Sequence, residues 1–269
     1  MQRVLKAAGE QRERRPIRPA QTHAVPRLTA TGPNQVWSWD ITKLALKTRG
    51  KWLYLYVVID LYSRYIVGWM IAETENAVSA QRFIGTAVAR HQIAAHSLTV
   101  HQDRGAPMTA VNFMSLRTEL KIDISHSRPR VCNDNPFSEA HFKKLKTQPC
   151  YPKYFNDLNH APFEVCATSV QYLLALGCLA ATPFPRRYND EHHHSGLNGH
   201  IPADVFHGRA DAVNRIKQRA LDAAYTAHPE RFVNGPPIAK APPRKVSINP
   251  LPISVVTVSA PMQNNEIGP

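Results

Sequence analysis

The segment KWLYLYVVID, residues 51–60, decides the fold predicted for this chain. It is crowded with aromatic and β-branched side chains, which suit the pleated surface of a sheet, so we predict a central strand here. Residues 36–46 and residues 65–72 (YIVGWMIA) have the same character. Only a short polar link, residues 60–64, separates the second and third of these segments. The three segments are therefore predicted to form an antiparallel meander.

Helical and strand patterns alternate after the meander. Helical periodicity covers residues 76–91 and 109–120, while short strand patterns cover residues 98–101 and 122–125. A further helix is predicted to start at Asn135 and Pro136, a capping residue followed by proline at the first helical position. This order predicts an α/β fold of the ribonuclease-H-like kind. It has a mixed five-stranded sheet flanked by helices, a basic N-terminal arm and an irregular C-terminal extension.

Composition points to a nucleic-acid partner. The chain has 269 residues, is 43% hydrophobic and carries a formal net charge of +13 with a pI of about 9.8. A chain of this length can build one substantial domain with appendages. A balance this basic favours a polyanion such as nucleic acid, although ordinary surface lysine and arginine residues are the alternative.

The predicted location is the cytoplasm. The four cysteines show neither C-x-x-C pairing nor zinc-ligand spacing, as expected for reduced thiols. Residues 1–18 are basic and lack the apolar run of a signal peptide. The apolar stretch 165–181 is short for a membrane span and is predicted to be a buried helix. We therefore expect no membrane partner.

Three regions are predicted along the chain. Residues 1–33 form a basic linker or arm, residues 34–208 the catalytic core, and residues 209–269 a C-terminal helix with a proline-rich tail. The helix is expected over residues 210–227, and a small strand over residues 246–248.

Three acidic residues occupy informative positions. Asp40 is predicted at the end of a strand, Asp103 after a second strand, and Glu139 in the first turn or so of the helix that begins near Pro136. Taken singly, each acid has an ordinary explanation: a surface acid at a strand end, or a partner for a helix dipole. Together, carboxylates on three such elements can converge on divalent cations.

The chemistry expected from such a trio is phosphoryl transfer. Two hard cations about 4 Å apart can activate an oxygen nucleophile and stabilise a leaving oxygen. We predict two Mg²⁺ or Mn²⁺ ions, with Asp40 bridging both, Asp103 holding one and Glu139 the other.

Basic residues near these acids are predicted to contact DNA phosphates. They are Lys143, Lys146, Arg104, Arg128 and Arg130. Lys143 and Lys146 follow Glu139 by four and seven residues and so share its helix face, although a solvated lysine face is the alternative. The run His192-His193-His194 is interpreted as structural or close to DNA, and not as a zinc site. Four tryptophans, Trp37, Trp39, Trp52 and Trp69, are predicted to be core residues.

Several motifs resemble a known family. They are WSWDITK (37–43), DLYSRYIVGW (60–69), HQDRG (101–105), SHSRP (125–129), NDNP (133–136) and Tyr188-Asn189. Over roughly residues 35–208 the chain resembles bacterial insertion-sequence transposases with a retroviral-integrase-type DDE core, in particular the second-frame product of the copy-and-paste group. The resemblance implies a catalytic triad of Asp40, Asp103 and Glu139, and DNA strand cleavage and strand transfer with Mg²⁺ or Mn²⁺.

The resemblance also implies partners and leaves alternatives. It implies the element's terminal repeats and target DNA as substrates, with self-association on DNA. The family's helix-turn-helix segment is not found here, so either the chain is truncated or an upstream product from another frame supplies the segment. The resemblance also implies a location with the nucleoid in the bacterial cytoplasm. Residues 163–187 depart from the family pattern. A catalytically inactive, DNA-binding remnant of a transposase and a ribonuclease-H-type nuclease remain the alternative functions.

Overall fold

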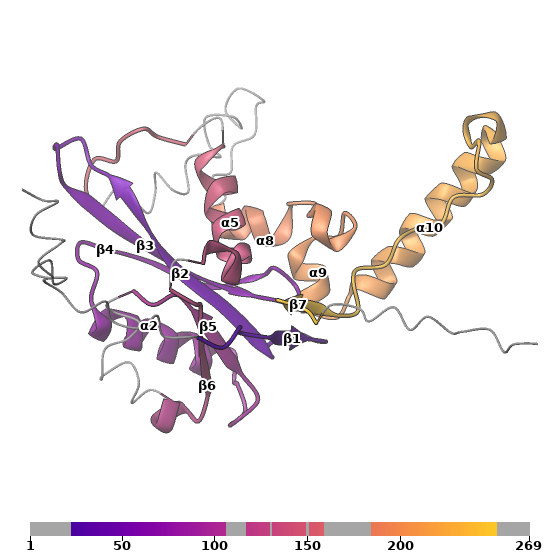
Figure 1. Ribbon diagram of the computed structural model, residues 1–269. Coiled ribbons are helices and arrows are strands. Elements are labelled where there is room, and N and C mark those ends of the chain that lie inside the picture. Colours follow the sequence, from indigo (N-terminus) through magenta and orange to yellow (C-terminus); the bar gives the residue numbers. More distant parts are fainter. Residues whose placement is uncertain (1–22, 106–116, 130, 149–150, 159–183, 252–269) are drawn as a thin grey trace, which may run out of the picture.

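A computed structural model describes residues 23–105, 117–129, 131–148, 151–158 and 184–251 (Figure 1). Its main feature is a five-stranded mixed sheet with the strand order β4-β3-β2-β5-β6. The strands are β2 (Val36–Ala45), β3 (Trp52–Asp60), β4 (Ile66–Ala72), β5 (Thr99–Gln102) and β6 (Asp123–His126).

The strand directions confirm the predicted ribonuclease-H-like arrangement. The first three strands pair antiparallel, whereas β5 runs parallel to β2 and β6 runs parallel to β5. Strand β2 therefore lies at the middle of the sheet, between the meander and the parallel half. Because β5 is parallel to the first half of β2, the carboxyl end of β5 meets the middle of β2.

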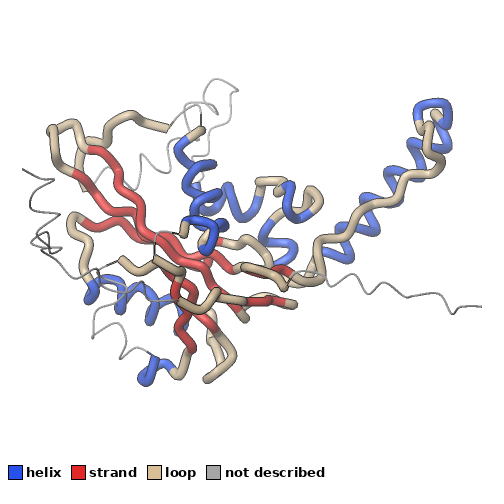
Figure 2. Tube along the Cα trace, viewed as in Figure 1, coloured by secondary structure: helices blue, strands red, loops and turns tan. Residues whose placement is uncertain are grey.

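Helices cover both faces of this sheet (Figures 1 and 2). Helix α2 (Ala77–Arg90) lies on one face, and α5 (Pro136–Lys146) and α8 (Phe184–Asp190) lie on the other. The short helix α9 (Pro202–Phe206) packs against α8. Asn76 caps α2, since its side chain accepts a hydrogen bond of 2.7 Å from the amide of Ser79.

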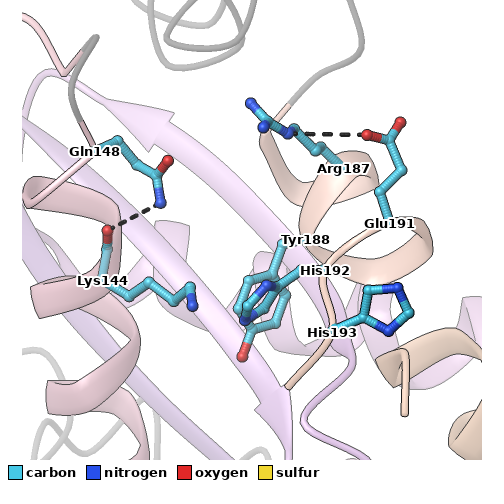
Figure 3. A pocket seen from close by; sticks show the side chains of 7 residues that line it. All are labelled: Lys144, Gln148, Arg187, Tyr188, Glu191, His192 and His193. Carbon is cyan, nitrogen blue, oxygen red and sulfur yellow. Dashed lines mark hydrogen bonds and ion pairs between the residues drawn. The ribbon is translucent and has the colours of Figure 1, made fainter. Parts of the chain in front are cut away.

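The face under α5 and α8 is apolar. Leu53, Leu55 and Val57 of β3 are buried there with Phe142 and Leu145 of α5, the two α5 residues predicted to be core. Tyr188 of α8 packs against the same cluster and faces α5 across a pocket (Figure 3).

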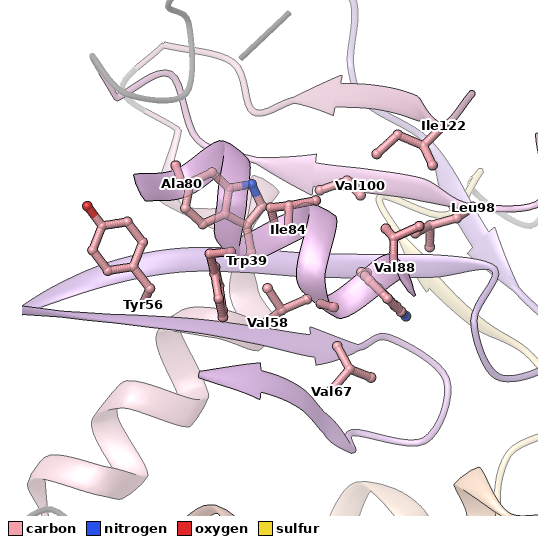
Figure 4. Packing of buried hydrophobic residues seen from close by; sticks show 13 residues of the cluster. Trp39, Tyr56, Val58, Val67, Ala80, Ile84, Val88, Leu98, Val100 and Ile122 are labelled. Atoms are coloured by element: carbon pink, nitrogen blue, oxygen red, sulfur yellow. The ribbon is translucent and has the colours of Figure 1, made fainter. Parts of the chain in front are cut away.

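The opposite face packs against α2 (Figure 4). Tyr56 and Val58 of β3 point to this side and are buried with Trp39, Ile84 and other residues of the cluster. The alternation of β3 side chains between two apolar layers explains its nearly continuous apolar sequence, because a strand covered on both faces needs no polar side.

The tryptophan prediction is correct for three of the four residues. Trp37 and Trp39 are fully buried, and Trp69 packs against the α5 side of the sheet. Trp52 is 44% exposed, so its prediction was wrong. It is the first residue of β3, next to the turn, where no helix covers the sheet.

The two ends of the described chain meet in a second, small sheet. Strand β1 (Leu28–Ala30) pairs antiparallel with β7 (Val246–Ile248). The strand predicted at residues 246–248 is thus confirmed. Its partner was not foreseen, because it lies within residues 1–33, which the sequence predicts to be an arm.

Helix α10 (Ala210–Ala227) projects away from the sheet, and residues 232–245 run back along it (Figure 1). None of its residues is buried. Gln218 ties the returning segment to the helix, accepting from the amide of Ala239 at 2.7 Å and donating to the carbonyl of Pro237 at 3.0 Å. Three short 3₁₀ helices occupy Cys132–Asp134, Ser195–Leu197 and Pro229–Arg231.

Two predicted helices fall on undescribed parts of the chain. Of residues 109–120, only 117–120 are described, and these are helical. Residues 165–181 lie outside the described residues, as do most of residues 163–187. Within the described part of the chain, no helix is both long and apolar enough to cross a membrane.

Candidate active site

The three predicted acidic residues line one cleft of about 460 Å³. Asp40 comes from β2, Asp103 directly follows β5, and Glu139 lies in the first turn of α5. The parallel pairing of Trp39 with Gln102 places Asp40 and Asp103 side by side. Asp40 lies in the middle of β2 and not at its end as predicted, because β2 continues past the end of β5 to Ala45 in its pairing with β3. Helix α5, which packs on β2 and β3, brings the third carboxylate to the same edge.

Asp40 has an unusual electrostatic environment. Burial raises the pKa of its carboxyl group to about 7, and the nearby charges of Asp103, Glu139 and Glu75 add to this effect. A backbone hydrogen bond of 2.8 Å from Ile41 opposes the shift. A carboxylate with a raised pKa beside other acids is typical of a site that a cation or proton completes.

The other two acids are held differently. Asp103 accepts a hydrogen bond of 2.6 Å from the hydroxyl of Ser127. Glu139 is exposed at the cleft, and desolvation together with the charge of Asp103 raises its pKa. Glu75, in the loop between β4 and α2, also lines the cleft. Sequence reasoning missed Glu75 because only the tertiary fold brings this loop to the acids.

The donor set suits hard divalent cations, which prefer carboxylate oxygens. Asp40, Asp103 and Glu139 are the residues that could hold such ions, with Glu75 at the margin. As the side chains stand, no group of three or more His, Cys, Asp or Glu residues in the described ranges is close enough to enclose a metal ion.

A buried polar network lies directly behind the acids. The hydroxyl of Ser38, two residues before Asp40, donates to Asn135 at 2.5 Å and lies 2.7 Å from the hydroxyl of Ser138. Asn135 and Pro136 begin α5 as predicted, but the Asn135 side chain makes no capping hydrogen bond. The Asn135 side chain instead links α5 to β2, because it accepts a hydrogen bond from the hydroxyl of Ser38.

A second part of this network holds the loop before α5. His101, two residues before Asp103, places its Nε2 atom 2.7 Å from the carbonyl oxygen of Asp134. The carboxylate of Asp134 accepts hydrogen bonds from Nε and Nη2 of Arg128, both at 2.9 Å. The sequence contained no local signal for this pair, since Asp134 seemed only a polar residue of a turn.

The predicted DNA-contacting residues have different surroundings. Arg128 is turned toward Asp134, although it still lines the cleft. Arg104 is exposed at the cleft, with its Nε donating to the carbonyl of Ser127 at 3.1 Å. On α5, Lys143 is exposed, whereas Lys146 donates to the hydroxyl of Thr42 at 2.6 Å.

Arg130 lies outside the described residues. The other DNA-contacting assignments therefore stay predictions; Arg104 and Arg128 line the cleft, and Lys143 and Lys146 are exposed on α5.

The histidine run borders a separate pocket of about 330 Å³ (Figure 3). His192 stacks at an angle against Tyr188, with 5.4 Å between ring centroids, and His194 meets the same ring edge-on. Burial lowers the pKa of both His192 and His194 to about 4, so both rings are neutral at pH 7. These contacts give the two histidines a packing role.

Comparisons with known proteins agree with this arrangement. Residues 30–132 match the integrase core domain family, a range that includes Asp40 and Asp103 and ends before Glu139. The transposase InsF of insertion sequence IS3A from Escherichia coli K12 is 34% identical over 126 residues. That match covers 47% of this chain and 43% of InsF. The transposase of insertion sequence element IS904 from Lactococcus lactis is 31% identical over 176 residues, covering 65% of this chain and 62% of that protein.

Solved structures with a similar backbone include retroviral integrases. A simian T-cell lymphotropic virus intasome in complex with the PP2A regulatory subunit B56 gamma has a TM-score of 0.49 and 17% identity, covering 70% of this chain and 60% of that chain. The HTLV-2 integrase catalytic core domain in complex with magnesium has a TM-score of 0.43 and 15% identity, covering 65% of this chain and 98% of that chain.

The chain spans about two fifths of InsF and three fifths of the IS904 transposase. Residues 30–132 thus match an integrase core domain, and the chain is similar over part of its length to transposases of bacterial insertion sequences.

Proposed function

We propose that this chain catalyses metal-dependent DNA strand cleavage and strand transfer during transposition. The observation that carries the proposal is the convergence of Asp40, Asp103 and Glu139, from three separate elements, on one cleft. The raised pKa of Asp40, to about 7, supports it, because bound cations would relieve the repulsion among these acids.

In this proposal Asp40, Asp103 and Glu139 hold two Mg²⁺ or Mn²⁺ ions. Such ions supply an activated oxygen nucleophile and charge stabilisation for the leaving oxygen. The hydroxyl of Ser127 orients the carboxylate of Asp103. The buried contacts of Ser38 fix β2 against α5, which sets the separation between Asp40 and Glu139.

DNA is the proposed substrate, both as the terminal repeats of the element and as target DNA. The formal net charge of +13 supports a polyanionic partner. Arg104 and Lys143 are the exposed cations proposed to contact its phosphates. Self-association on DNA and a helix-turn-helix partner product complete the proposal, because two ends must be brought together and recognised.

A strand-transfer assay with preformed terminal-repeat ends and Mg²⁺ tests the proposal. We expect joining by the wild-type chain and at least a 100-fold loss in Asp40→Asn, Asp103→Asn and Glu139→Gln, since each change removes a negatively charged oxygen ligand. The matched control is Asp123→Asn, an exposed acid on β6 away from the cleft. Undiminished joining in any of the three variants would remove that residue from the assignment.

The same assay separates the alternative functions. Binding of the ends without cleavage or joining indicates an inactive DNA-binding remnant. Digestion of RNA–DNA hybrids in preference to joining indicates a ribonuclease-H-type nuclease.

A further inference from the structure

The small sheet formed by the two ends of the described chain reaches the start of the catalytic helix. Its strands β1 and β7 pair in register, and the hydroxyls of Thr29 and Ser247 lie 2.9 Å apart. Ala30, Val246 and Ile248 are buried in one apolar cluster, against which Phe137 of α5 packs. The end strands therefore touch the first turn of the helix that carries Glu139.

Asn249, directly after β7, makes the polar part of this connection. Its Nδ2 donates to the carboxylate of Asp134 at 2.8 Å and to the carbonyl of Pro26 at 3.0 Å. One amide group thus joins three segments: the residues before β1, the end of β7 and the loop before α5. Its backbone has a φ of +48°, a left-handed conformation in which asparagine and glycine are favoured.

Asp134 links Asn249 to the segments that carry the cleft acids. Arg128 donates to its carboxylate from the backbone amide and the guanidinium, and Asn249 completes the set. The Asp134 carbonyl oxygen is hydrogen-bonded to the ring of His101, which lies two residues before Asp103. Asn135, the next residue, begins α5 and is bonded to Ser38 of β2.

Among the described residues, Asn249 is the one whose side chain joins Asp134 to the end of β7, a segment far away in the sequence. The contact spans 115 positions, whereas Arg128 is six positions from Asp134. Without Asn249, the loop before α5 loses its polar connection to the paired end strands.

We infer that Asn249 is a positioning residue, through which the paired end strands β1 and β7 hold the start of α5, and with it Glu139, in the geometry that the cleft requires. The inference rests on the proposed function for its catalytic consequence, but its structural part can be measured without DNA or metal.

The variant Asn249→Gly tests the inference, because glycine accepts the left-handed backbone and removes only the amide. Asn249→Asp keeps a similar shape and places a second carboxylate against Asp134, so its effect should be larger. Asn234→Gly is the matched control, since Asn234 is exposed near the tip of the α10 arm.

Hydrogen exchange followed by mass spectrometry gives the first readout. In Asn249→Gly, the amides of residues 137–142 should exchange about tenfold faster, the effect of losing one hydrogen bond to a charged group. A peptide from β3 should exchange as in the wild type, and Asn234→Gly should match the wild type throughout. Unchanged exchange at the start of α5 overturns the inference.

Strand transfer gives the second readout. In Asn249→Gly, the Mg²⁺ concentration for half-maximal joining should rise about 3- to 10-fold, at or below the low end of the about 10- to 100-fold typical of direct outer-shell partners, because Asn249 contacts Asp134 and not a proposed metal ligand. Affinity for the DNA ends should stay unchanged. Faster exchange with unchanged metal dependence overturns the positioning role. If the wild type does not join DNA, the proposed function fails, and the exchange experiment still decides whether Asn249 holds α5.

Discussion

The cleft and the loop behind it, residues 131–135, shift the pKa values of their carboxyl groups in opposite directions. Asp134, in the loop, is buried and accepts from the Arg128 backbone amide, its guanidinium and the Asn249 amide. The hydrogen bonds from Arg128 hold the pKa of Asp134 far below its usual range. Asp40, in the cleft, accepts one recorded hydrogen bond, from the amide of its neighbour, and its pKa rises to about 7.

This contrast separates structural acids from functional ones. A buried carboxylate surrounded by donors stabilises the fold in its charged form. A carboxylate desolvated beside other acids destabilises the fold when charged, and natural chains retain such strain at functional sites. Burial raises the pKa of both carboxyl groups, but only Asp134 has the guanidinium and amide donors that reverse the effect.

The largest expected effect on stability comes from removing the charge of the buried Asp134. Asp134→Asn removes the charge that Arg128 faces and turns an amide toward its donors. We expect a loss of about 2–4 kcal/mol in the free energy of unfolding, below the full cost of a broken buried pair because Arg128 is partly exposed. Urea unfolding measures it. Asp123→Asn, which loses only an exposed ion pair with Arg117, should cost under about 1 kcal/mol. A similar loss in both variants would contradict the contrast.

Removing the charge of Asp40 in the cleft should change stability in the opposite direction. Without metal at pH 8, Asp40→Asn should raise the free energy of unfolding by about 1–2 kcal/mol, since it removes a desolvated charge that is partly screened by solvent. The same variant should be inactive in strand transfer. Thermal or urea unfolding of the metal-free chain provides the measurement, and a destabilised Asp40→Asn would place Asp40 with the structural acids.

The pH dependence of stability follows from the same pKa. A raised pKa means that the folded chain binds the Asp40 proton more tightly than the unfolded chain does. The resulting stabilisation is complete below the ordinary value of 3.8 and is lost as pH rises toward about 7. Unfolding curves between pH 4 and 8, without metal, should therefore show a decline that Asp40→Asn reduces. Identical pH profiles for the two chains would speak against the shift.

Cation binding should partly remove the contrast. At pH 8, Mg²⁺ at ten times its dissociation constant should stabilise the wild type by about 1.4 kcal/mol through mass action. Asp103→Asn and Glu139→Gln should show less stabilisation, whereas Asp123→Asn should match the wild type. Melting temperatures across a Mg²⁺ titration measure this. Equal stabilisation of all four chains would indicate binding away from the cleft.

The smallest expected effect is on DNA binding and concerns two lysines of α5, of which one makes a hydrogen bond to the protein and the other is exposed. Lys143 is exposed, and Lys146 is bonded to Thr42. Lys143→Ala should weaken DNA binding across sequences and lower the salt-dependence slope by about 1, as expected for one phosphate contact. Lys146→Ala should change the slope less. Binding titrations at several salt concentrations compare them, and equal slopes would mean that the Thr42 contact opens when DNA binds.

Much of this fold and site could be predicted from local patterns. The apolar run 51–60 predicted β3, because a strand covered on both faces has to be apolar along its length. Asn135 and Pro136 predicted the start of α5. The motifs around Asp40, Asp103 and Glu139 predicted the acids that share the cleft, but not that Asp40 would lie in the middle of its strand.

What the sequence could not decide depends on contacts between distant segments. Strands β1 and β7 are three residues each, too short to show a period, and their hydroxyl contact spans 218 positions. Glu75 looked like an ordinary loop acid, and Arg128 a free cation, until the fold supplied their neighbours. Periodicity and turn residues are local properties that the sequence determines. The surroundings of a charged side chain are set by the packing of distant segments, and only the tertiary structure decided which carboxylates are satisfied by donors and which lie together in the cleft.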